Sequence, residues 1–110
     1  MADIWVLCQS PTHHHESSLV RVDTISWMSA TSERLSGGAI GSQETVVLAH
    51  RSTEGGTSLP EDFHLALLAQ VGMARERARD SDEDQVLKAA LDESGTWSWA
   101  MAPAREMWPG

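Results

Sequence analysis

The chain has 110 residues, enough for one domain with a single hydrophobic core. Its eight basic residues stand against sixteen acidic ones, which gives a formal charge of −8. A surface this acidic repels a phosphate backbone, so we expect no direct binding to nucleic acid. The hydrophobic fraction of 41% is far above that of disordered chains, and the composition therefore predicts a folded domain.

The cysteine content and the N-terminal residues indicate in which cellular compartment the protein is expected. The single cysteine, Cys8, cannot form a disulfide within the chain. The first residues carry no basic segment followed by a long apolar run, which a secretory signal requires. No apolar run approaches the ~20 residues that span a bilayer. We therefore expect a cytoplasmic protein that does not engage a membrane.

Three strands are predicted in the first half of the chain. Residues 4–8 form a short apolar run of strand-forming residues. Residues 19–28 alternate polar and apolar side chains, with a slip of phase near Asp23 that predicts a β-bulge. Residues 29–43 contain Ser-Gly-Gly and are predicted to form a loop. Residues 44–50 are the third strand.

A helix is predicted over residues 58–79. Ser58 and Glu61 have the spacing of a capping box, and Pro60 suits the first turn, where its missing N–H costs nothing. The apolar residues that follow recur at helical spacing and define a stripe facing a sheet or a partner. This stripe consists of Phe63, Leu67, Val71 and Ala74, and is widened by Leu65 and Leu68.

A second helix is predicted from Ser81. The carboxylates that follow Ser81 suit the positive end of a helix dipole, and Gly95 suits the C-terminal end. Its apolar face is predicted to contain Val86, Leu87, Ala90 and Leu91. Residues 96–101 then alternate as a strand, which places both tryptophans of Trp97-Ser98-Trp99 on one face.

The order of these elements, β-β-β-α-α-β, predicts an α+β fold. About four strands form a small antiparallel or mixed sheet, and two helices pack on one of its faces. Residues 1–102 are predicted to form a single domain, followed by a C-terminal tail over residues 103–110.

The run of three histidines offers a metal-binding hypothesis. In an extended loop His13 and His15 point the same way, and His50, at the end of a predicted strand, is a candidate third ligand. No Cys-x-x-Cys or His-x-x-x-His spacing accompanies them. A solvated loop without a physiological metal is the alternative interpretation.

Patterns that indicate catalysis are weak. Cys8 lies within an apolar strand, where burial keeps a thiol protonated and inert. The glycine-rich residues 36–41 lack the Lys and Ser/Thr of a phosphate-binding loop. We therefore nominate no catalytic residue and expect no cofactor.

Two features are candidates for recognition of a protein. The Trp97–Trp99 pair either fills the core, the more frequent outcome for such residues, or forms an exposed platform. At a sheet edge that strand would pair with a second copy of the chain or with another strand, and Trp108 is a further candidate contact. The second feature is an acidic stretch, Asp80, Asp82, Glu83 and Asp84, which either ends one helix and begins another or contacts a basic groove.

The favoured hypothesis is a non-catalytic, acidic protein-interaction module, such as a small regulator, inhibitor or immunity-type factor that acts on a basic partner. The alternative is a metal- or ligand-binding protein that uses the histidine loop and the tryptophan face. A small enzyme is the third hypothesis.

Overall fold

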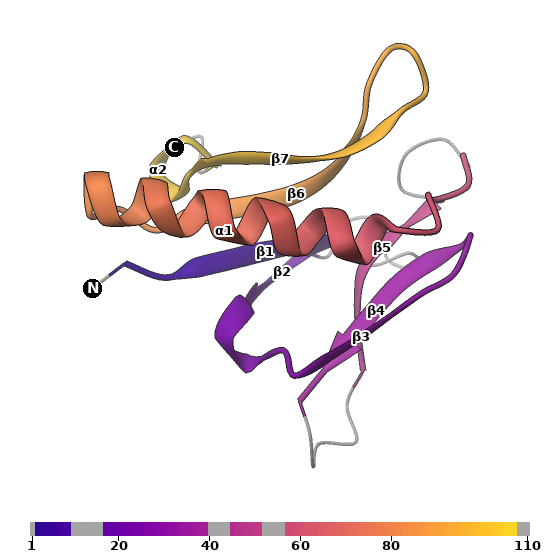
Figure 1. The fold of residues 1–110 in the computed structure, drawn as a ribbon, viewed down its shortest axis with the longest axis horizontal. Helices are drawn as coiled ribbons and strands as arrows, with labels where there is room; N and C mark the ends of the chain where they lie inside the picture. The colour runs from indigo at the N-terminus through magenta and orange to yellow at the C-terminus, as the bar shows by residue number, and fades with distance from the viewer. Residues whose placement is uncertain (1, 10–16, 40–44, 52–56, 108–110) are drawn as a thin grey trace.

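The computed structural model describes residues 2–9, 17–39, 45–51 and 57–107, which form two β-sheets and one long helix (Figure 1). The elements in chain order are β1 Ile4–Gln9, β2 Ser17–Arg21, the 3-10 turn η1 Val22–Thr24, β3 Trp27–Ala30, β4 Arg34–Gly38, β5 Val46–His50, α1 Phe63–Ser81, β6 Gln85–Leu91, β7 Trp97–Pro103 and α2 Ala104–Met107. The α+β class is therefore confirmed. The predicted single sheet and pair of packed helices are wrong.

The larger sheet has the strand order β2-β1-β6-β7. β1 runs parallel to β6, whereas its pairing with β2 and the pairing of β6 with β7 are antiparallel. The smaller sheet is an antiparallel β3-β4-β5 meander. α1 lies across one face of the larger sheet, while β3 and β4 lie to one side of it (Figure 1).

The predicted strand over residues 19–28 is broken into two strands that belong to different sheets. η1 occupies the position of the expected bulge, where the Thr24 hydroxyl donates to the Arg21 carbonyl at 2.7 Å. The phase slip near Asp23 is therefore a turn that carries the chain from the larger sheet to the smaller one. A turn resolves the conflict between the two apolar phases because Val20 of β2 and Met28 of β3, both partly buried, each pack against the core from their own sheet.

The predicted loop over residues 29–43 contains strand β4. A Cβ at Gly37 would lie 3.0 Å from the backbone oxygen of Trp27 and 3.3 Å from Leu48 Cδ1. Glycine is needed here because the neighbouring strand and the core approach the backbone closely. The third strand is confirmed as β5.

The helix begins later than its sequence predicts. α1 starts at Phe63, after an Asp62 N-cap that makes no side-chain capping bond, so the Ser58–Glu61 capping box is wrong. Phe63, Leu67, Val71 and Ala74 are buried as predicted. Leu65 and Leu68, in contrast, are 57% and 56% exposed.

The second predicted helix is strand β6. The backbone of Asp82 adopts a left-handed conformation (φ 55°), which ends α1 and reverses the chain into the sheet. β6 lies between β1 and β7, so both of its edges are hydrogen-bonded. Leu87 is fully buried on the face toward α1 and Val86 is buried on the opposite face, a distribution that a strand in the middle of a sheet satisfies.

The strand over residues 96–101 is confirmed and is longer than expected. β7 continues to Pro103, which lies opposite Gln85 in the register. Gly95, expected at a helix end, has φ 84° in the turn between β6 and β7. Ala104–Met107 form the short α2, and residues 108–110 lie outside the described residues.

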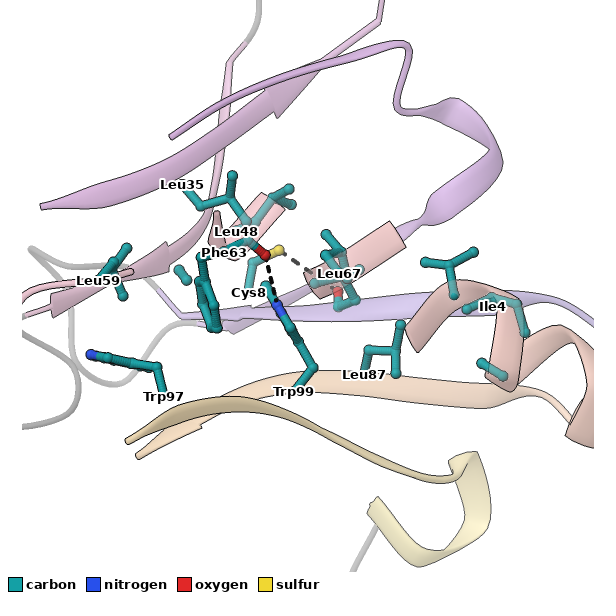
Figure 2. Packing of buried hydrophobic residues seen from close by; sticks show 14 of the residues in the cluster. Ile4, Cys8, Leu35, Leu48, Leu59, Phe63, Leu67, Leu87, Trp97 and Trp99 are labelled. Carbon is teal, nitrogen blue, oxygen red and sulfur yellow. Dashed lines mark hydrogen bonds between the residues drawn. The ribbon is translucent and has the colours of Figure 1, made fainter. Parts of the chain in front are cut away.

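One hydrophobic core joins both sheets to α1. Figure 2 shows Phe63 of α1 between Leu35 and Leu48 of the smaller sheet and Trp97 and Trp99 of the larger one. These five side chains are at most 6% exposed. Within the described ranges, no helix is long and apolar enough to cross a membrane.

Candidate protein-interaction surfaces

Trp97 and Trp99 are part of the core. The ring of Trp99 stacks on Phe63 at a centroid distance of 4.8 Å, and Trp97 meets the same ring edge-on at 5.7 Å. Each indole N–H also has a partner: Trp97 donates to the Thr57 carbonyl at 3.1 Å and Trp99 donates to the Phe63 carbonyl at 3.2 Å. These rings therefore offer no surface to a partner in this structure. Trp108 lies outside the described residues.

The strand that carries these tryptophans is an edge strand. β7 has β6 on one side and no neighbour on the other among the strands that the structure describes. Ser98 and Ala100 point away from α1 and are exposed. The edge location that the sequence hypothesis of strand pairing requires is therefore present, although the indoles themselves face inward.

The acidic stretch divides into structural and exposed carboxylates. Asp84 accepts hydrogen bonds from the backbone N–H of Asp3 at 2.8 Å and from Trp5 Nε1 at 3.1 Å. Glu83 pairs with Arg105 at 3.2 Å. Asp80 and Asp82 are exposed, and neither carboxylate has a hydrogen-bond or ion-pair partner among the described residues. Asp80 and Asp82 are thus the members of the stretch that are free to contact another molecule.

A cleft of about 620 Å³ opens beside this corner of the molecule. It is lined by Ala2, Asp3, Ile4, Asp23, Arg75, Ala78, Arg79 and Asp82. An ion pair of 3.1 Å between Arg75 and Asp23 crosses from α1 to η1. The lining carries three carboxylates and two guanidinium groups. The sequence does not predict that Asp3 and Asp23 are neighbours of Asp82, because the three residues come from distant segments that only the fold brings together.

The histidine hypothesis rests mostly on residues without a described position. His13 and His15 lie outside the described residues, and His50, the last residue of β5, is partly buried. Among the described residues, no group of three or more His, Cys, Asp or Glu side chains is arranged to hold a metal ion. The hypothesis therefore stays a prediction.

Cys8 occupies the core side of β1. Burial raises the pKa of its thiol to about 12, and the Sγ atom donates to the Val6 carbonyl at 3.7 Å. A thiol in this state is protonated at neutral pH and is a poor nucleophile.

The outward side of α1 is apolar along its first three turns. This outer face, as we term it, consists of Leu65, Leu68, Ala69, Gly72 and Met73, all of which are exposed. The prediction that Leu65 and Leu68 widen the buried stripe is wrong, because helical periodicity places Leu65 on the side of α1 opposite the stripe. The observed burial shows that the stripe is narrower and that these leucines point to solvent.

Comparisons with protein-family models, curated proteins and solved structures each found no match to this chain.

Proposed function

We propose that this chain is a non-catalytic, acidic protein-interaction module that acts on a basic partner protein. The observation that carries the proposal is the position of Asp80 and Asp82: both are exposed at the end of α1, and Asp82 lines the 620 Å³ cleft together with Asp3 and Asp23. Carboxylates grouped at a concave surface favour the cationic side chains of a partner.

The net charge of the whole chain also favours a basic partner. A formal charge of −8 raises the rate at which a basic protein encounters this surface, and it disfavours acidic competitors. Arg75 already pairs with Asp23 at 3.1 Å, so Asp3 and Asp82 are the carboxylates of the cleft lining that attract a further cation. A lysine or arginine of the partner that enters the cleft is the contact that we expect.

The test compares two charge-matched variants in affinity capture from the native host, with mass spectrometry and stepwise salt elution. The first variant combines Asp80→Asn with Asp82→Asn, which keeps a residue that tolerates the left-handed backbone at position 82. The control combines Glu93→Gln with Glu106→Gln, which removes the same charge at exposed positions outside the cleft lining.

We expect a basic protein to be captured by the wild type and by the control, and to elute from the Asp80/Asp82 variant at lower salt. Each of the two carboxylates at the rim is expected to contribute about 0.5–1 kcal/mol to binding, so the removal of both charges should lower the affinity roughly tenfold. Equal retention by both variants, or capture of acidic proteins only, would contradict the proposal.

A further inference from the structure

The first three turns of α1 are apolar on the side away from the sheet as well as on the side that covers it. Between Phe63 and Ala74 only His64 and Gln70 are polar, whereas the last two turns carry three arginines. A helix that is hydrophobic all round is normally buried all round. Here one side covers the sheet, while Leu65, Leu68 and Met73 are 57%, 56% and 51% exposed.

We propose that the outer face of α1 binds the outer face of α1 in a second copy of this chain, with the two helices antiparallel. The outer face is a different surface from the acidic cleft, although Arg79 lies at the edge of both, and the proposal does not depend on the proposed function. Shape, charge and dipole orientation each support a second copy as the occupant.

The shape of the outer face is self-complementary. Gly72 has no atom within 4 Å of the position where a Cβ would lie, so it leaves a depression on the helix surface. In an antiparallel pair whose two-fold axis is level with Gln70, Leu68 of each copy lies level with Gly72 of the other. The large side chain then fills the space above the small one, and this happens twice because of the symmetry. Small residues at a crossing point also allow two helices to approach closely.

The charges at the two ends of the helix match in the same register. Glu61 is exposed in the turn that leads into α1, and Arg79 is exposed in its last turn. The two-fold axis that pairs Leu68 with Gly72 also places Glu61 of one copy level with Arg79 of the other. Antiparallel helices in addition bring opposite ends of their dipoles together, which favours this direction over the parallel one.

The area of the outer face determines how strongly the two copies are expected to bind each other. Stable interfaces bury about 800 Å² on each partner, and one helix face is smaller than that. The two copies, each with a charge of −8, also repel one another. We therefore expect a weak, reversible dimer with a dissociation constant in the micromolar range, ~10–100 µM.

Sedimentation equilibrium from about 5 to about 500 µM is the test, because this range brackets the expected dissociation constant. The wild type should move from the monomer mass of 12.0 kDa toward twice that mass. Leu68→Glu should remain a monomer throughout. Leu19→Glu is the matched control: Leu19 is 49% exposed on β2, away from α1, and its variant should dimerise as the wild type does.

Gly72→Gln separates association from folding. A Cβ at position 72 meets nothing within 4 Å in the monomer, and glutamine forms helix better than glycine, so thermal stability should rise. The same side chain fills the depression that Leu68 of the second copy needs. We expect at least tenfold weaker dimerisation from a better-folded monomer.

A charge exchange tests the register. Glu61→Arg and Arg79→Glu should each weaken the dimer, and the double variant should recover it, because the pair is restored across the interface. A wild type that stays monomeric over the whole range overturns the proposal. So does a dimer that survives Leu68→Glu and Gly72→Gln but is lost on Met101→Pro, which removes an N–H that faces the open edge of β7, since that dimer forms through this edge.

Discussion

Phe63 is the residue on which the packing of the core is centred. Its ring stacks on Trp99 and meets Trp97 edge-on, and its backbone carbonyl accepts the Trp99 indole N–H at 3.2 Å. The same side chain is next to Leu35 and Leu48 of the smaller sheet in Figure 2. The first residue of α1 therefore fixes the helix to both sheets at once.

Phe63→Ala is expected to lower the free energy of unfolding by about 3–5 kcal/mol, because a 1% exposed ring is removed and its two aromatic partners lose their contact. Urea denaturation followed by far-ultraviolet circular dichroism measures the change. Leu19→Ala, at an exposed position, should change stability by no more than about 0.5 kcal/mol. Similar losses in the two variants would contradict the central role of Phe63.

Cys8 should make folding stability fall in alkaline solution. Burial raises the pKa of the folded thiol to about 12 from an ordinary value of 9.0, so the unfolded state loses this proton first as the pH rises. The stability present below pH 9.0 is therefore lost progressively up to about pH 12. Urea titrations of wild type and Cys8→Ala between pH 8 and pH 10.5 measure this, and the wild type should show the steeper decline. A thiol reagent should modify native Cys8 at pH 8 far more slowly than the urea-unfolded chain.

At the scale of elements, sequence patterns predicted those strands and the helix whose conformation is determined by interactions between residues close in the chain. β1, β5, α1 and β7 follow from apolar runs, alternation and helical spacing, and all four are present. β6 was missed because Val86, Leu87, Ala90 and Leu91 fit a helix equally well. Its conformation is decided by β1, some 80 residues away in the chain, and by β7. The cleft was missed for the same reason, since Asp3, Asp23 and Asp82 are distant in sequence.

The two glycines with opposite backbone requirements provide an element-scale prediction. Gly72→Ala should stabilise the monomer by about 1 kcal/mol, because alanine favours the helix and nothing crowds the new methyl group. Gly95→Ala should destabilise it by about 1 kcal/mol, because φ 84° in the β6–β7 turn strains any residue with a Cβ. Melting temperatures measured at a low micromolar chain concentration compare the pair. A change of the same sign in both would contradict the assigned conformations.

At the scale of the whole molecule, Asp84 ties the two halves of the chain together. Its carboxylate holds the backbone of Asp3 and the indole of Trp5, residues 81 and 79 positions away. These bonds lie where β1 and β6 begin their parallel pairing, at Ile4 and Gln85. The acidic stretch thus contributes to the junction of the sheet as well as to its surface charge.

Asp84→Ala should therefore destabilise the fold by about 2–3 kcal/mol, because two partly buried donors lose a charged acceptor. Asp80→Ala removes the same charge from an exposed position without a described partner and should change stability by less than about 0.5 kcal/mol. Chemical denaturation of both variants at neutral pH makes the comparison. An equal effect would mean that Asp84 acts through net charge alone.

The parallel pairing of β1 with β6 also has a consequence for synthesis. β1 lies in the interior of its sheet, between β2 and β6, and some 80 residues of chain separate it from β6, its second neighbour. During translation β1 therefore has one edge of unpaired backbone groups until β6 is made, and side chains such as Val6, which are buried in the complete fold, are not yet fully covered. A nascent chain stalled before β6 is the species most prone to pair wrongly, and completion of the larger sheet is expected to be the slow step of folding.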